Sequence, residues 1–243
     1  MSTEKVDMVV GKLTVPVIFK NIKNIHLSVN PPDGCVKVSA PFSMDRETIR
    51  VFIISKMGWI RKKQKNFIEQ EREEPREFLL RESHYYLGRR FLLNIIEDKN
   101  SSGVSLKQNV LEVSVSPGFT GKKIEAMVEK WYRAELKIIV AEKISSFEKI
   151  MGIQIASFSI KKMKTRWGSY NPTKNTILLN LDLIKKPIHL IEYIVAHEMV
   201  HSFERTHNAK FIAYMDKFMP QWRILKEELN KLPVGSGIEK RDY

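Results

Sequence analysis

Two histidines lie one helical turn apart in the stretch His197–Glu198–Met199–Val200–His201. Residues four apart share one face of a helix, so both imidazoles can reach a single metal ion. Zinc binds imidazole nitrogen well, and Glu198 lies slightly to one side, where it can act as a general base toward an attacking water. Two ligands and one carboxylate at this spacing are typical of metal-dependent hydrolases.

A third histidine, His207, follows six residues after His201. It can reach the same ion if the helix ends near residues 204–206 and the chain turns back. Three histidines leave one coordination position open for water, as a catalytic zinc requires. For random placement of these residue types, the three-histidine pattern with its glutamate has a probability on the order of a few in ten thousand. The sequence therefore predicts a metal site at His197, His201 and His207, holding one Zn²⁺ or another divalent ion, with Glu198 as the catalytic base.

A basic, aromatic turn precedes this motif, with the sequence Lys-Thr-Arg-Trp-Gly-Ser at residues 164–169. Arg166 is a candidate for oxyanion stabilisation or substrate anchoring, and its alternative role is structural, bonding carbonyls in the turn. Apolar residues alternate over 176–183, which predicts a strand. Asn180 points to the other face of that strand, so we expect an exposed or edge strand to which an extended peptide could add. Asn180 is then either a substrate contact or an ordinary surface polar residue.

The elements that must position these residues fall into two regions. Residues 1–118 read as a β-rich region of hairpins plus one helix, which Ser43 or Asp45 can cap. Residues 119–243 contain a long helical pattern that Gly152 ends, a short strand, and a helix that Pro187 opens. A further helix is predicted over 208–232, with its apolar residues facing inward. The expected fold class is α+β, with a domain boundary at residue 118.

Composition limits the class of protein further. Hydrophobic residues make up 43% and charged residues 28% of the 243 residues, as in ordinary globular proteins. The single cysteine, Cys35, excludes an intrachain disulfide, no apolar run reaches about 18 residues, and no secretory signal is visible. We therefore expect a cytoplasmic protein. The net charge of +13 suits either a solvated surface or an anionic partner.

Taken together, these motifs resemble the YgjP-like family of metal-dependent hydrolases, which is similar to minimal gluzincin-like metallopeptidases. The resemblance rests on residues 164–169, the strand at 177–183, the His197–His201 motif and His207 with Phe211, and it extends over roughly residues 15–230. It implies a zincin-like core with an active-site helix and a backing helix. It also implies zinc on the three histidines and activation of water by Glu198.

Three functional hypotheses follow. The first is a zinc metallopeptidase that cleaves peptides or proteins. The second is a metal-dependent pyrophosphatase acting on nucleoside triphosphates such as UTP, which the basic residues around Arg166 would suit, although no P-loop and no carboxylate cluster for magnesium is visible. The third is a DNA-associated protease or a basic nucleic-acid-binding protein, which only the net charge favours.

Overall fold

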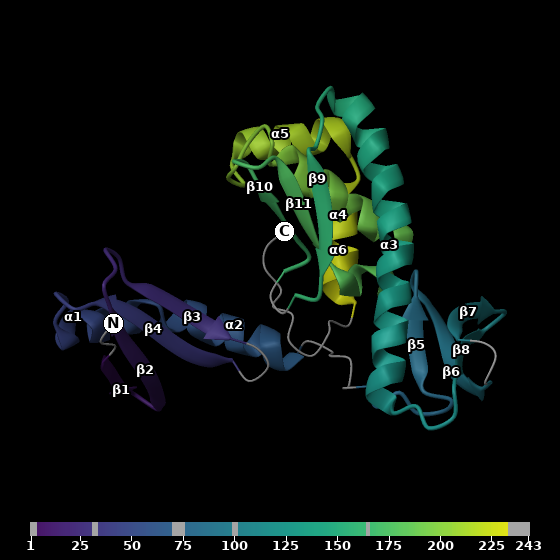
Figure 1. The fold of residues 1–243 in the computed structure, drawn as a ribbon. Coiled ribbons are helices and arrows are strands. Elements are labelled where there is room, and N and C mark those ends of the chain that lie inside the picture. The colour runs from purple at the N-terminus through teal and green to yellow at the C-terminus, as the bar shows by residue number, and fades with distance from the viewer. Residues whose placement is uncertain (1–3, 31–33, 70–75, 99–101, 164–165, 233–243) are drawn as a thin grey trace. The chain divides into compact units, whose positions relative to one another are not determined.

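The computed structural model describes residues 4–30, 34–69, 76–98, 102–163 and 166–232. The described residues up to 69 belong to one compact unit, and those from 76 to 232 belong to a second. Both units combine strands with helices, which confirms the expected α+β class (Figure 1). No helix in the described ranges is long and apolar enough to cross a membrane.

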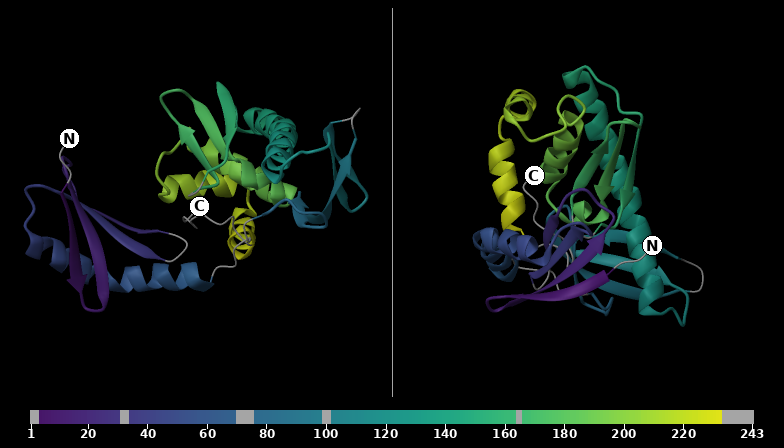
Figure 2. Two further views of the ribbon diagram at one scale, coloured as in Figure 1. Left: turned by 60° about the horizontal axis from the view of Figure 1, so that its bottom comes forward. Right: turned by 90° about the vertical axis from the view of Figure 1, so that its left-hand side faces the viewer.

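The first unit is a four-stranded sheet covered on one face by two helices (Figure 2). Its strands are β1 (Glu4–Val10), β2 (Leu13–Lys20), β3 (His26–Asn30) and β4 (Cys35–Pro41), in the order β1-β2-β4-β3. Strands β2 and β4 are parallel, and the other two pairs are antiparallel. β3 and β4 form the predicted hairpin, although residues 31–33 of its turn lie outside the described residues.

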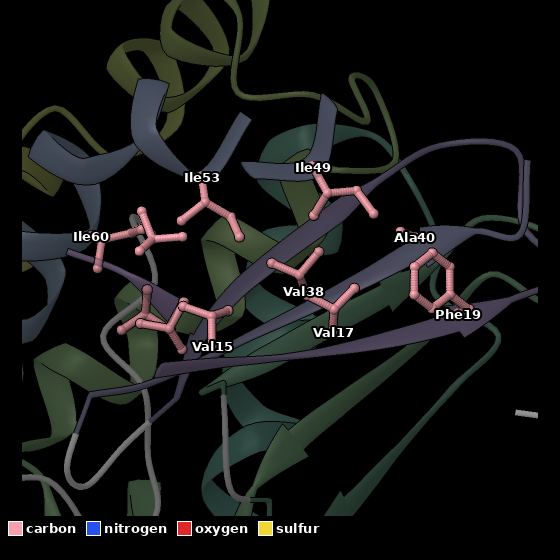
Figure 3. Packing of buried hydrophobic residues seen from close by; sticks show 11 residues of the cluster. Val15, Val17, Phe19, Val38, Ala40, Ile49, Ile53 and Ile60 are labelled. Carbon is pink, nitrogen blue, oxygen red and sulfur yellow. The ribbon is translucent and has the colours of Figure 1, made fainter. Parts of the chain in front are cut away.

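Two helices stand where the sequence predicted one. α1 (Arg46–Ser55) begins after Asp45, whose carboxylate accepts a hydrogen bond from the Thr48 N–H at 2.8 Å. Lys56, with φ −99° and ψ 2°, leaves the helical conformation, and α2 (Met57–Glu69) begins directly after it. The two helices contribute isoleucines to a core that the sheet completes with valines, alanine and phenylalanine (Figure 3). The residues labelled there are Val15, Val17, Phe19, Val38, Ala40, Ile49, Ile53 and Ile60.

The second unit begins with its own four-stranded sheet. The strands are β5 (Ser83–Tyr86), β6 (Arg89–Glu97), β7 (Gly103–Lys107) and β8 (Val110–Val115), in the order β5-β6-β8-β7. The turn between β5 and β6 is hydrogen-bonded to residues 184 and 185, much later in the chain. The Leu87 N–H donates to the Ile184 carbonyl at 2.8 Å, and the Gly88 N–H donates to the Lys185 carbonyl at 3.1 Å. This sheet therefore shares a compact unit with residues beyond 118, and the divide in the chain falls earlier than the boundary expected at 118.

The long helix α3 (Gly121–Met151) runs alongside the β5–β8 sheet and the elements that follow α3 in the chain (Figure 1). It packs against strands β7 and β8, then against β9 and helix α4. Gly152 ends it in the left-handed conformation at φ 70°, as the sequence predicted. The elements that follow are β9 (Ser157–Lys161), β10 (Gly168–Asn171), β11 (Thr176–Asn180), the 3₁₀ helix η1 (Leu181–Lys185), α4 (Ile188–Val200), α5 (Ala209–Phe218) and α6 (Trp222–Lys231).

Three expectations about this last region are wrong. The strand expected over 176–183 ends at Asn180, whose side chain accepts from the Asp182 N–H and so caps η1. It is also not an edge strand: the sheet order is β10-β11-β9, so β11 is bonded on both sides. The helix expected over 208–232 is two helices, α5 and α6. Pro220 lies between them, and proline cannot donate the backbone bond that a continuous helix needs.

Candidate metal centre

Helix α4 carries the first histidine and the glutamate into the interior of the second unit. It packs against α3, α5, α6 and β10, which explains why its residues are apolar nearly all round. His197 is 1% exposed and Glu198 is 2% exposed. An imidazole and a carboxylate are costly to bury, so their place in the last turn of a buried helix points to a chemical role.

His201 is the residue that ends α4, with φ −62° and ψ −13°. Its Nδ1 lies 3.0 Å from the carbonyl oxygen of Glu204. A carbonyl only accepts hydrogen bonds, so Nδ1 carries the proton and the neutral ring keeps its lone pair on Nε2. A hydrogen bond of this kind is what fixes the tautomer and orientation of metal-binding histidines.

The turn between α4 and α5 places His207. The Glu204 carboxylate accepts from the Thr206 N–H at 3.1 Å and from its hydroxyl at 3.0 Å. Asn208 then caps α5, accepting from the N–H groups of Lys210 at 2.9 Å and Phe211 at 3.1 Å. Local hydrogen bonds on both sides of His207 thus define the path that turns its ring back toward α4.

The three histidines converge as the sequence predicted. One nitrogen from each of His197, His201 and His207 lies within 4.8 Å of the other two, and the Nε2 atoms of His197 and His207 are 3.0 Å apart. Phe211, itself 2% exposed, lies against all three imidazoles, with ring centroids 4.7 to 4.9 Å away. Its ring therefore supports the cluster from the α5 side.

The ionisation of these rings suits metal binding. Burial lowers the pKa of His197 well below the ordinary value, and the neighbouring rings of His201 and His207 lower it further. Burial also lowers the pKa of His201, although its bond to the Glu204 carbonyl opposes the shift. Neutral imidazoles offer lone pairs, so these residues fit the divalent metal that the motif implies.

Strand β10 holds the Glu198 carboxyl in place. A methyl group built on Gly168 would lie 2.5 Å from Glu198 Oε1, so only glycine leaves room for the carboxyl there. The Tyr170 backbone N–H donates a hydrogen bond to the same side chain. Burial raises the pKa of Glu198 to about 8, against the positive charge of Arg166 and the Tyr170 hydrogen bond, which lower it. A cation bound at the histidines would favour the charged carboxylate further.

These groups line one pocket of about 450 Å³. Besides the three histidines and Glu198, its walls are formed by residues 168–170, Pro172, Arg166 and Arg205. The sequence identified Arg166 but missed the roles of Gly168, Tyr170 and Arg205. Tyr170 acts through its backbone, which no residue pattern shows, and Arg205 reaches the pocket from a turn.

Asn180 has a different place from the one expected. It is fully buried. Its Nδ2 donates to the carbonyls of Met163 at 2.9 Å and Arg166 at 3.0 Å, and its Oδ1 accepts from the Met163 N–H. It therefore fixes the segment that carries Arg166. Trp167 is buried, whereas Lys164 and Thr165 of the motif lie outside the described residues.

Three imidazoles gathered around one point, with a buried carboxylate beside them in an open pocket, define a metal-dependent hydrolase. Comparison with protein families gives the same class: residues 23–232 match the family described as YgjP-like, metallopeptidase domain. The match spans most of the chain, and this protein belongs to that family. It is an enzyme whose family implies a divalent metal and a peptide or protein substrate.

Two solved structures are similar over part of the chain. One is the metallopeptidase zymogen of Pyrococcus abyssi abylysin, with 20% identity and a TM-score of 0.35 over 37% of this chain and 90% of that one. The other is the metallopeptidase zymogen of Methanocaldococcus jannaschii jannalysin, with 23% identity and a TM-score of 0.32 over 39% of this chain and 92% of that one. Comparison with curated proteins gives no match. The nucleoside triphosphate and nucleic-acid hypotheses gain no support from the family match.

Proposed function

We propose that this protein is a zinc metallopeptidase in which His197, His201 and His207 hold the zinc and Glu198 is the general base. The observation that carries the proposal is the convergence of three imidazole nitrogens within 4.8 Å, beside a buried carboxylate. Three nitrogen ligands are a common catalytic zinc set, because they leave a position for water and substrate. When bound, zinc would supply Lewis acidity toward the scissile carbonyl and the attacking water.

Glu198 moves the proton in this mechanism. Its carboxylate takes a proton from the attacking water and delivers it to the nitrogen of the leaving amine. Gly168 and the Tyr170 N–H restrict where the carboxyl can lie, so the base is held in position before substrate arrives. Arg166 lines the same pocket and can stabilise the oxyanion that develops on the scissile carbonyl, or anchor the substrate.

Strand β10 is the candidate for orienting the peptide. Among the described strands it pairs with β11 alone and is an edge of its sheet, and its residues 168–170 line the pocket. An extended peptide could therefore add to this edge by backbone hydrogen bonds, which would bring a peptide bond alongside Glu198. This assigns to β10 the strand addition that the sequence placed at Asn180.

The test is cleavage of a mixed peptide library by the full-length, zinc-loaded protein, read by mass spectrometry. Glu198→Gln keeps the size of the side chain but cannot take the proton, so products should disappear while bound zinc, measured by elemental analysis, stays at the wild-type level. His197→Ala should lose both zinc and products. Gly103→Ala is the control, because nothing lies within 4 Å of the added methyl.

Two outcomes would contradict the proposal. One is equal cleavage by wild type and Glu198→Gln, which would remove Glu198 from the chemistry. The other is release of pyrophosphate from nucleoside triphosphates that depends on Glu198 without any peptide cleavage. That result would mean that the site activates water for attack on phosphorus and not on a peptide carbonyl.

A further inference from the structure

Two guanidinium groups line the pocket from different parts of the chain. Arg166 precedes β10, and Arg205 lies in the turn between α4 and α5. Both residues are exposed. Across the described part of the chain, no ion pair to either guanidinium is found. Two cationic side chains thus face the space where a substrate would lie.

Glu204, beside Arg205 in the chain, and Glu198, which also lines the pocket, are already engaged. Glu204 precedes Arg205, but its carboxylate accepts hydrogen bonds from Thr206 and from Asn208 within the turn. Among the described residues that line the pocket, Glu198 is the one carboxylate, and it is buried beside the histidines. The open part of the pocket is therefore positive.

We propose that Arg166 and Arg205 form a subsite for a substrate carboxylate, so that the enzyme selects peptides with an acidic group close to the scissile bond. This inference rests on the proposed peptidase function. A guanidinium matches a carboxylate with two parallel hydrogen bonds, and an arginine without an internal partner has all its donors available. A lysine or arginine of the substrate would instead meet two like charges. The carboxylate can come from an Asp or Glu side chain or from the free C-terminus of the peptide.

The test compares matched peptides with the full-length protein. Quenched fluorescent peptides carry Glu, Gln or Lys at each position around the cleaved bond, each made with a free or an amidated C-terminus. We expect kcat/KM for the best Glu peptide to exceed that of its Gln counterpart by about tenfold, as one charge-assisted pair would give. Arg205→Gln should reduce this ratio by about fivefold, and Arg205→Glu should shift the preference to the Lys peptide.

The matched control is Arg90→Gln, which removes one exposed positive charge from β6. It should leave the ratio of Glu to Gln peptides unchanged, because Arg90 does not belong to the subsite. If Arg90→Gln changes the ratio as much as Arg205→Gln, the preference reflects overall charge, and the subsite is refuted. If the enzyme prefers peptides with a free C-terminus whatever the side chain, the subsite is supported and its ligand is the C-terminal carboxylate.

Binding separates this inference from the proposed function. In metal-free Glu198→Gln, fluorescence anisotropy with the same peptides should show about tenfold tighter binding of the acidic peptide. Adding Arg205→Gln or Arg166→Gln should reduce that difference by about fivefold. If wild type cleaves no peptide but this binding pattern holds, the peptidase proposal fails and the subsite stands. If cleavage is Glu198-dependent but acidic and neutral peptides are cleaved and bound equally, the subsite is refuted and the peptidase proposal stands.

Discussion

Gly168→Ala tests whether the backbone of β10 positions the base. The added methyl would lie 2.5 Å from Glu198 Oε1, 2.7 Å from its Cγ and 2.8 Å from its Cδ, whereas ordinary contacts begin at 3.4 Å. The carboxyl must therefore retreat by about 0.9 Å, the difference between 3.4 and 2.5 Å. A displacement of about 1 Å in a catalytic group costs about a hundredfold in rate, or about 2.7 kcal/mol in the barrier.

The assay is steady-state cleavage of a peptide that the wild-type enzyme hydrolyses. We expect kcat to fall about a hundredfold with a smaller change in KM, because the carboxyl acts in the chemical step. Zinc content should stay at the wild-type level, since the three heavy atoms nearest to the methyl all belong to Glu198. Gly103→Ala, whose methyl meets nothing within 4 Å, should keep wild-type kcat.

A double variant gives the most direct check on this reasoning. If Gly168→Ala acts only through the carboxylate, combining it with Glu198→Gln should lower kcat no further than Glu198→Gln alone. Additive losses would show that the methyl disturbs another part of the site. A folded, zinc-loaded Gly168→Ala enzyme with kcat within about threefold of wild type would refute the placement of Glu198 against Gly168.

Three further predictions concern groups around the site and away from it. Phe211→Leu removes the ring that supports the three imidazoles, so zinc should bind about tenfold more weakly in a chelator competition, while Ile212→Leu on the same helix should have no effect. Asn180→Ala leaves two backbone carbonyls without their buried donor, so thermal unfolding should show a loss of about 2 to 3 kcal/mol; a loss under about 0.5 kcal/mol would contradict the bonding described. Burial lowers the pKa of His84 to about 4 in the folded protein, against about 6.5 when unfolded. Its contribution to stability is therefore present above pH 6.5 and declines as the pH falls toward 4, by up to about 3 kcal/mol. Denaturant unfolding across this pH range should show a smaller decline in the free energy of unfolding for His84→Gln than for wild type. Equal declines in the two proteins would contradict the role given to His84.

The secondary structure that the sequence predicted correctly depends on local signals. Asp45 caps α1, Gly152 ends α3, and Pro187 precedes α4, each through bonds or dihedral preferences of a few neighbouring residues. The errors have local causes too. The single long helix after His207 overlooked Pro220, and the break at Lys56 has no strong signal, since neither proline nor glycine stands at that position.

Strand positions within a sheet were not predictable in the same way. The alternation over 176–183 is compatible with an edge strand or a central one, because periodicity describes the faces of a strand and not its neighbours. Asn180 looked like a surface residue for that reason. Its burial depends on Met163 and Arg166, more than ten residues away along the chain, whose backbone groups it bonds.

The gathering of the three histidines, by contrast, followed from the sequence alone. His197 and His201 meet because a helix repeats every 3.6 residues, and His207 follows after a short turn, so the cluster is nearly a local structure. The pocket around it is not local. Gly168 makes room for Glu198 and Arg205 faces the same space as Arg166 only because β10, α4 and the turn before α5 pack together. Residue types and spacing therefore determined which side chains could gather around a metal ion, whereas the position of the Glu198 carboxyl and the charge lining the pocket were decided by tertiary packing.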